Sequence, residues 1–346
     1  MPILPDKAES QVFLQLNQGP GLLFDILGAG AFQAIVLALR LGIFDALGDG
    51  SLAGREMAHK TGTDERGITI LLDFLESCGY VRSIDGRYRN TALTKKWLLS
   101  TSPTNLADMV RTWNDYIFRF WGEYIEDSIR NGKPPMTLYE WFDKRPDSWR
   151  IFNSFEMAAA HWVGENVVNA VVLPPKARRL LDIGGGHGLY SIMFCRKYPQ
   201  LSATIFDSHE PLNTARENIN VEKMGDRISV KEGDFWVDAF GQGNDVALLF
   251  NIIHHHTPEK NVELLRKIRN ALNPGGVIVI FDQLSDMISG PFNTATIRFF
   301  ALVYLAMFGG RTYSRKEVRD WLGQVGFVEL PQARQVPTVV VAKRPR

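Results

Sequence analysis

The chain has 346 residues, of which 45% are apolar and 22% charged, the composition of a globular protein with room for about two domains. The formal net charge of +1 provides no overall field that would favour nucleic acid or an anionic membrane as a partner. The two cysteines, Cys78 and Cys195, are far apart in the sequence, which argues against a disulfide framework or structural zinc and predicts a reducing, cytoplasmic location.

The first strongly apolar segment runs from Phe24 to Leu47 and is dense in Ala, Leu, Ile and Phe. It predicts a helix that is apolar on nearly every face and is interrupted at Gly42. Such a helix is buried, either in a core or between subunits. We therefore expect it to form a contact between two copies of the chain.

The next segment, residues 51–98, has the order of a winged helix: two helices, predicted over Leu52–Lys60 and Asp64–Cys78, and then a hairpin with its turn at Asp85-Gly86. This pattern raises DNA binding as a rival function. The second helix carries four acidic residues and one cation, so it would repel phosphate. Three arginines on the wing keep nucleic acid as the alternative, but a structural module is favoured.

Residues 104–172 are predicted to be helical and are rich in aromatic side chains. Most of these fill a core, but flat apolar side chains also line sites for planar substrates. Leu173-Pro174-Pro175 ends the segment before the first strand. A later apolar stretch, Phe299–Phe308, is too short to span a bilayer and is expected to be a buried or interface helix. The candidate substrate-binding residues are Phe152, Phe155, Met157, His161, Trp162 and Phe299.

From Arg179 onward, predicted strands and helices alternate, which is the pattern of a parallel α/β sheet. The predicted parallel strands are 179–183, 201–206, 228–232, 246–253 and 277–281. Residues 327–330 and 336–342 are predicted to close the sheet as an antiparallel pair.

The first of these strands leads into a glycine-rich turn, which is followed by a helical run. Strand, glycine turn and helix together bring the backbone against a nucleotide-like ligand. The spacing is Asp182-x-Gly184-x-Gly186-x-Gly188, and Leu189 stands where the dinucleotide fingerprint has its last glycine. The spacing therefore indicates a ligand other than a dinucleotide.

Polar or aromatic residues follow the later strands, at the edge where open α/β sheets bind ligands. Asp207 lies 23 positions after Gly184, where a carboxylate can accept both ribose hydroxyls of an adenosine. Asp234 can accept from the adenine amino group, and Phe235 can stack on the ring. His254 follows the fourth strand and Asp282 follows the fifth.

These motifs resemble those of the class I S-adenosylmethionine (SAM) dependent small-molecule O-methyltransferases, the family of the caffeic-acid, acetylserotonin and bacterial polyketide enzymes. The resemblance covers nearly the whole chain and includes the glycine turn and the stretches Gly233–Phe235, Asn273–Gly276 and Gly309–Thr312. It implies an α/β fold with a Rossmann-like seven-stranded sheet and an all-helical, winged-helix-like dimerisation domain. The implied partners are a second copy of the chain and a small-molecule methyl acceptor, with no nucleic acid and no membrane.

The resemblance also implies the domain boundaries and the residue roles. The domains are a dimerisation domain at 1–102, a helical linker contributing to the substrate pocket at 103–173, and a SAM-binding domain at 174–346. His254 is implied as the general base, with Asp282 as its supporting acid, and the family's second acid falls on Gly310. An imidazole suits proton removal because its pKa lies near neutrality. The implied SAM-binding residues are Asp182, Gly184, Gly186, Gly188, Asp207, Gly233, Asp234, Phe235 and Asn251.

The departure at Gly310 leaves other reactions open. The same fold could methylate carbon or nitrogen, with His254 orienting the acceptor, or could keep SAM for another reaction or for regulation. Three consecutive histidines, His254 to His256, also raise a metal site with a distant ligand such as Asp282 or His161. Successive side chains point in different directions, so three in a row rarely hold one ion, and we predict no metal.

Overall fold

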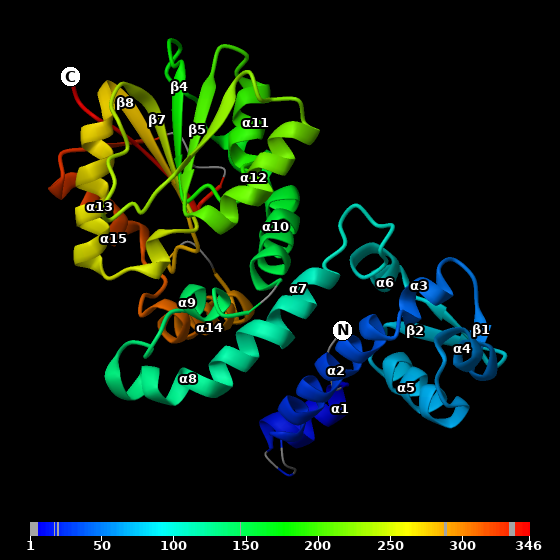
Figure 1. The fold of residues 1–346 in the computed structure, drawn as a ribbon. Helices are drawn as coiled ribbons and strands as arrows, with labels where there is room; N and C mark the ends of the chain where they lie inside the picture. The colour runs from blue at the N-terminus through cyan, green and yellow to red at the C-terminus, as the bar shows by residue number, and fades with distance from the viewer. Residues whose placement is uncertain (1–5, 17, 19–20, 146, 287–288, 332–335) are drawn as a thin grey trace. The chain divides into compact units, whose positions relative to one another are not determined.

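The structure is a computed structural model that describes residues 6–16, 18, 21–145, 147–286, 289–331 and 336–346. The chain forms two compact units, Met1–Asn114 and Asp115–Arg346 (Figure 1). The expected linker at 103–173 contributes to both, because α7 (Ala107–Thr112) belongs to the first unit and the helices after residue 117 belong to the second.

The N-terminal unit is mainly helical. Its elements before α7 are α1 (Lys7–Ser10), the π-helical turn η1 (Gln11–Gln15), α2 (Leu23–Arg40), α3 (Ile43–Leu47), β1 (Leu52–Ala53), α4 (Gly54–Thr61), α5 (Glu65–Ser77), β2 (Val81–Ile84), β3 (Arg87–Asn90) and α6 (Ala92–Trp97). A second π-helical turn, η2 (Trp113–Ile117), follows α7.

The expected wing is present as an antiparallel hairpin. β2 and β3 pair across Asp85 and Gly86, which both have positive φ, at 51° and 72°. β1 adds a third strand, with Leu52 opposite Tyr88. The helix expected from Leu52 therefore begins two residues later, at Gly54, because Leu52 and Ala53 complete this small sheet.

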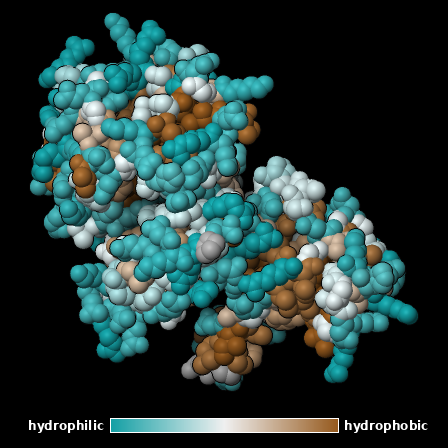
Figure 2. Space-filling view, in the orientation of Figure 1, coloured by the Kyte–Doolittle hydropathy of each residue, from teal (hydrophilic) through white to brown (hydrophobic). Residues whose placement is uncertain are grey.

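The apolar segment at Phe24–Leu47 forms α2 and α3, with Gly42 in the left-handed region between them at φ +67°. One face of α2 packs into the core of the unit through Ala34, Ile35 and Ala38. Outside this core contact α2 exposes large apolar side chains, which Figure 2 shows gathered over its first turns. An exposed patch of this kind marks an interaction surface. Its residues are Leu22, Leu23, Ile26 and Leu27, with Leu37 further along the helix.

The C-terminal unit is built on a seven-stranded sheet. Its elements are α8 (Phe118–Asn131), α9 (Leu138–Phe142), α10 (Ser148–Ala170), β4 (Arg179–Ile183), α11 (Leu189–Lys197), β5 (Ser202–Asp207), α12 (His209–Val221), β6 (Ile228–Glu232), β7 (Asn244–Phe250), the 3₁₀ turn η3 (Ile253–His255), α13 (Pro258–Ala271), β8 (Leu272–Phe281), α14 (Pro291–Phe308), α15 (Arg315–Gln324), β9 (Val328–Leu330) and β10 (Val339–Lys343).

The strand order is β6-β5-β4-β7-β8-β10-β9, which confirms the predicted fold class. The first five strands in this order are parallel, and β10 and β9 close the sheet as the predicted antiparallel pair. The strand order reverses at β4: β5 and β6 lie on one side of it, and β7 and β8 lie on the other. This reversal is the place where open α/β sheets bind ligands, beyond the carboxyl ends of the strands.

The sheet is covered on both faces, as its continuous apolar strands require. Successive residues of β4 show the alternation, because Leu180 packs toward α10, α11 and α12 while Leu181 packs toward α13 and α15. Val279 and Ile280 of β8 divide in the same way. Figure 1 shows these two helix layers on either side of the sheet.

Two helices of 18 residues, α2 and α14, are long and apolar enough to cross a membrane by length and composition alone. The stretch predicted at Phe299–Phe308 is the second half of α14, so the helix is longer than the predicted apolar stretch. α14 packs against α8 and buries Ile297, Val303 and Tyr304. One face of α14 is therefore buried within the C-terminal unit.

Candidate active site

The parallel strands bring the candidate residues to one edge of the sheet. Gly184 follows β4, Asp207 ends β5, and Gly233 follows the end of β6. Asn251 follows β7 and Asp282 follows β8 at the same edge. Because parallel strands all end at this edge, five separate segments of the chain contribute to one site.

The glycine turn lies against the strands beside it. Gly184 has φ +67°, and a Cβ atom there would lie 2.4 Å from Cδ1 of Ile252. Gly186 also has positive φ, at 44°, and its backbone N–H donates to Oδ2 of Asp207 over 2.8 Å. The turn therefore needs glycine because its backbone has positive φ and because Ile252 packs directly against it.

Asp182 lies beneath the turn and is 2% exposed. The Ser191 hydroxyl, from α11, donates to its Oδ2 over 2.7 Å. Burial raises the pKa of Asp182 to about 7, and the Ser191 hydrogen bond opposes this effect. Its carboxyl therefore ties the turn to the following helix.

Asp207 is half-buried and accepts from the backbone N–H groups of Gly186 and Ser208, at 2.8 and 2.7 Å. Burial raises the pKa of Asp207 to about 6, against these hydrogen bonds, which favour the charged form. The Ser208 hydroxyl also donates to Oδ1 over 3.5 Å, so Oδ2 is the oxygen that keeps a second lone pair for a further donor.

The segment after β6 presents the exposed Asp234 carboxylate followed by two rings, those of Phe235 and Trp236. Oδ1 of Asp234 accepts from the backbone N–H of Trp236 over 2.8 Å. The Phe235 ring meets the His256 ring edge-on, with centroids 5.6 Å apart. Gly233 is confined, because a Cβ atom there would lie 2.6 Å from Cζ of Phe206.

His254 and Asp282 form a buried pair, 5% and 1% exposed. The Nδ1–H of His254 donates to Oδ1 of Asp282 over 2.6 Å. The same oxygen accepts from the backbone N–H of Gln283 over 2.8 Å. With Nδ1 protonated and held by the carboxylate, Nε2 carries the lone pair that can take a proton.

The face of His254 is covered by Tyr304 of α14. The two rings stack with centroids 3.7 Å apart and planes 16° from parallel. The Tyr304 hydroxyl donates to Oε1 of Gln283 over 2.6 Å, and Nε2 of Gln283 donates to Oδ1 of Asn251 over 3.4 Å. Asn251 has φ +54°, a left-handed conformation that is uncommon for residues other than glycine. The hydrogen bonds from Tyr304 through Gln283 to Asn251 help to hold this conformation.

The three consecutive histidines point in different directions, with neighbouring rings 88° and 89° apart. The His255 ring packs between Tyr139 and Phe308, and burial holds the pKa of His255 well below its usual value. Burial lowers the pKa of His256 to about 4. Among the described residues, no group of three or more His, Cys, Asp or Glu side chains is arranged to hold a metal ion.

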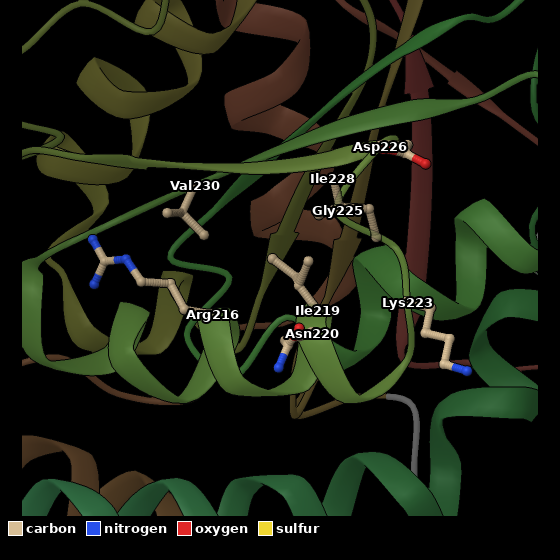
Figure 3. Close-up of a pocket in the computed structure, with 8 residues that line it drawn as sticks. All are labelled: Arg216, Ile219, Asn220, Lys223, Gly225, Asp226, Ile228 and Val230. Carbon is tan, nitrogen blue, oxygen red and sulfur yellow. The ribbon is translucent and has the colours of Figure 1, made fainter.

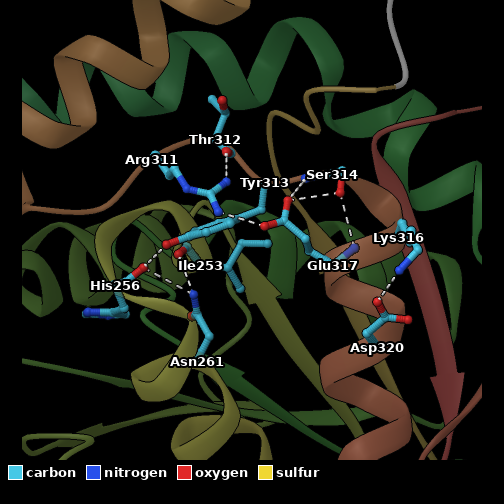
Figure 4. Close-up of polar contacts among 10 residues, drawn as sticks. All are labelled: Ile253, His256, Asn261, Arg311, Thr312, Tyr313, Ser314, Lys316, Glu317 and Asp320. Atoms are coloured by element: carbon cyan, nitrogen blue, oxygen red, sulfur yellow. Dashed lines mark hydrogen bonds and ion pairs between the residues drawn. The ribbon is translucent and has the colours of Figure 1, made fainter.

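The backbone of the histidine turn is fixed from two sides, as Figure 4 shows. The Asn261 amide of α13 donates to the carbonyl oxygens of Ile253 and His256, at 2.9 and 3.3 Å. The Tyr313 hydroxyl donates to the same His256 carbonyl over 2.5 Å. These three bonds hold the position of His254 through main-chain atoms.

The predicted substrate-binding residues occupy different surroundings. Phe152 packs edge-on against Tyr139, which in turn contacts His255, and Phe155 lies beside Phe152. Phe299 stacks on Trp121 of α8, with centroids 5.7 Å apart.

The other three predicted residues lie elsewhere on α10. The Met157 sulfur receives a hydrogen bond from the Asn218 amide of α12, at 3.6 Å. His161 is exposed and acts electrostatically on His187, and Trp162 is 64% exposed. The described C-terminal unit therefore brings Phe152 and Phe155, but not Trp162, toward the histidine turn.

Glu156, which lies one helical turn after Phe152 on α10, was not among the residues predicted for the site. Burial raises the pKa of Glu156 to about 7, while His254 and a hydrogen bond from Asn251 oppose this effect. A signal was available, because no Asp, Glu, Lys or Arg other than Glu156 occurs between Arg150 and Glu165. A single acid within an otherwise uncharged stretch of helix indicates a candidate functional residue.

A surface cavity of about 490 Å³ lies away from this site, between α12 and β6 (Figure 3). Its lining includes Arg216, Lys223 and Asp226, and it contains none of the candidate site residues. Its charges are mixed, so it indicates no particular ligand.

The chain matches a family model described as the O-methyltransferase domain over residues 121–328, and one described as the O-methyltransferase dimerisation domain over residues 26–100. It is 31% identical to the 3-hydroxy-5-methyl-1-naphthoate 3-O-methyltransferase of Streptomyces sahachiroi over 91% of each chain. It is 26% identical to the L-tyrosine C(3)-methyltransferase of Streptomyces lavendulae, over 89% of this chain and 86% of that one. Human N-acetylserotonin methyltransferase in complex with SAM has a similar fold, with a TM-score of 0.81 at 24% identity over 99% of this chain and 100% of that one.

Proposed function

Because this chain belongs to the family of SAM-dependent O-methyltransferases, we propose that it methylates a hydroxyl group of a small aromatic or polyketide-like molecule, with His254 as the general base. The observation that carries this assignment is the buried hydrogen bond of 2.6 Å between His254 and Asp282. It leaves Nε2 as the proton acceptor, on a ring that the backbone contacts of its turn hold in place.

The residues at the strand ends fit SAM as the cofactor. Oδ2 of Asp207 has a lone pair available for a ribose hydroxyl, and the exposed Asp234 carboxylate beside the Phe235 ring suits an adenine. Gly186 leaves space for a ligand, because a Cβ atom at this residue would meet only Oδ2 of Asp207 within 4 Å among the described residues, at 3.9 Å. We propose that Gly184, Gly188 and Gly233 give the cofactor site its shape. We propose that Asp182 supports the glycine turn from beneath, and that Asn251 lies between the cofactor and the acceptor.

Bound SAM supplies a methyl group that is already electrophilic. The chain therefore has to orient the acceptor hydroxyl and remove its proton. In the proposed step, Nε2 of His254 accepts the hydroxyl proton, and the Asp282 carboxylate stabilises the imidazolium that forms. Tyr304 holds the plane of the ring, and Phe152 and Phe155 are proposed to contact the flat part of the acceptor.

The test is product formation from methyl-labelled SAM with hydroxylated naphthoates, phenols and hydroxyindoles. We expect transfer by the native protein, and a loss of about 100-fold or more in kcat in His254→Ala with unchanged affinity for S-adenosylhomocysteine. His59→Ala, an exposed histidine of the N-terminal unit, is the matched control and keeps full activity. A fully active His254→Ala would remove the general-base role.

Methylation of a ring carbon is the second candidate, favoured by the relative named L-tyrosine C(3)-methyltransferase. The same incubation separates the two reactions, because NMR of the product distinguishes a methyl ether from a methyl group on carbon. A methyl ether supports the first proposal, and a C-methyl product replaces it with the second.

The proposed assembly is a homodimer. The dimerisation-domain match and the exposed apolar face of α2 support it. We propose that residues 1–102 dimerise, that 103–173 contribute to the acceptor site, and that 174–346 bind the cofactor.

The cytoplasm is the proposed location. The chain has two cysteines, far apart in the sequence, and Cys195 is a buried free thiol, which suits a reducing compartment.

A further inference from the structure

Glu156 lies on the face of α10 that is turned toward the histidine turn. Phe152 and Glu156 are four residues apart and share a helix face. Phe152 contacts the Tyr139 ring, and the Tyr139 hydroxyl is 3.5 Å from Nε2 of His255. Asn153, three residues before Glu156 and beside it on the helix surface, donates through its amide to Oγ1 of Thr214 on α12 over 2.9 Å.

The groups that act on the Glu156 carboxyl come from several different elements. His254, Asp282 and the Asn251 amide reach it from the carboxyl edge of the sheet. Three buried tyrosines have raised pKa values, mainly because burial disfavours the charged phenolate, and the Glu156 carboxyl adds to each shift. They are Tyr139 of α9, Tyr190 of α11 and Tyr304 of α14. Glu156 therefore faces the same small volume as the proposed base.

This carboxyl has little to satisfy it within the described chain. The Asn251 amide donates one hydrogen bond, and no lysine or arginine is among the groups that act on it. Glu156 is neither fully buried nor fully exposed, so one side of it is open. A partly desolvated carboxyl with unused acceptor positions is costly unless a further donor reaches it.

We propose that Glu156 binds a second hydrogen-bond donor on the methyl acceptor, so that the acceptor carries an amino group or another hydroxyl in addition to the hydroxyl that is methylated. This inference rests on the proposed function, because it assigns that donor to the same bound molecule. Nε2 of His254 takes the reacting hydroxyl, and Glu156 fixes which hydroxyl faces it.

The experiment uses three hydroxynaphthalenes that differ in the group adjacent to the hydroxyl, which is an amino group, a second hydroxyl or a methyl group. Their kcat/KM values are measured by S-adenosylhomocysteine formation with the native protein, Glu156→Gln and Glu156→Leu. The affinities of the same compounds are measured by calorimetry in the presence of S-adenosylhomocysteine. Glu165→Gln, an exposed acid on the same helix, is the matched control.

We expect the native protein and the control to prefer a donor-bearing compound over the methyl compound by about tenfold or more, in affinity and in kcat/KM. Glu156→Leu loses this preference and keeps the methyl compound as a substrate. In Glu156→Gln, a preference reduced for both donor-bearing compounds indicates that the carboxylate charge strengthens the hydrogen bond. A preference retained for both indicates that a neutral acceptor is sufficient, because the amide oxygen still accepts.

Two results would overturn the proposal. One is an unchanged preference in Glu156→Leu. The other is an equal loss for all three compounds, which would mean that Glu156 serves only to position Asn251. A preference in affinity without any methyl transfer would support the recognition by Glu156 and reject the proposed reaction, so the two failures are distinguishable.

Discussion

A Cβ atom on Gly310 would lie 2.1 Å from the carbonyl oxygen of His254. It would also lie 2.7 Å from the carbonyl carbon of His255, so the chain after α14 passes directly against the histidine turn. No side chain fits at position 310 in this arrangement, and a second supporting acid is therefore sterically excluded there. Asp282 is the carboxylate that holds His254, and Tyr304 covers the imidazole face.

The first prediction follows from this contact. Gly310→Ala must displace the histidine turn, which costs about 1–3 kcal/mol in stability and lowers kcat by about 100-fold because the base is misplaced. Gly323→Ala on α15 is the matched control, because a Cβ atom there has no heavy atom within 4 Å. Steady-state kinetics and thermal unfolding of both variants check the expectation. An active, fully stable Gly310→Ala would show that the turn has room to relax.

The sequence was sufficient to predict which strand ends meet. His254 and Asp282 are 28 residues apart, yet both follow parallel strands, and the strand pattern alone placed them at one edge. The same reasoning brought Asp207 to the glycine turn, where it accepts from Gly186. Periodicity and strand ends are local signals, and here they were enough.

Other parts of the site could not be predicted in this way. Glu156 and Tyr304 lie on helices that cover the edge of the sheet, and helical periodicity does not determine which face of α10 or α14 turns inward. The absence of an acid at Gly310 was visible in the sequence, but its cause was not, because the close approach to His254 depends on tertiary packing. The missing acid at position 310 is therefore explained by the lack of space for a side chain beside His254.

The second prediction concerns Asp207 and the pH dependence of cofactor affinity. Its pKa of about 6 means that the carboxylate is protonated below this value in the free protein. A protonated carboxyl is a poorer acceptor for ribose hydroxyls, so affinity for S-adenosylhomocysteine should fall as the pH is lowered through about 6. Calorimetry across this range measures the change.

Asp207→Asn should weaken the same affinity about tenfold or more near neutral pH and remove this pH dependence. Asp226→Asn, an exposed acid, is the control and should behave like the native protein. Equal affinities for Asp207→Asn and the native protein would contradict the assignment of the ribose contact.

The third prediction concerns Asp182 and the stability of the ligand-free protein. The pKa of Asp182 is raised from 3.8 to about 7 in the folded state, so the folded state holds a proton that the unfolded state releases between these values. The free energy of unfolding should therefore fall as the pH rises from about 4 to about 7, by at most about 1.4 kcal/mol per pH unit from this group.

Asp182→Asn removes that titration while keeping an oxygen that can accept from Ser191. The native protein should lose stability relative to this variant as the pH rises through the window, in unfolding measured at one protein concentration. A constant difference in stability across the window would mean that Asp182 is charged at every pH in it.

The fourth prediction concerns the exposed apolar face of α2. Leu23 and Ile26 are 46% and 57% exposed, so burial of the remaining surface by a partner subunit would contribute about 1 kcal/mol for each. Placing a charge at Ile26 would desolvate that charge within the interface, so Ile26→Asp should weaken dimerisation by about 100-fold or more. Val221→Asp is the matched control, because Val221 is 74% exposed at the end of α12 and is not part of this face. Sedimentation of both variants at low concentration tests this expectation. Ile26→Asp should be monomeric and Val221→Asp dimeric. A stable dimer of Ile26→Asp would place the subunit contact elsewhere.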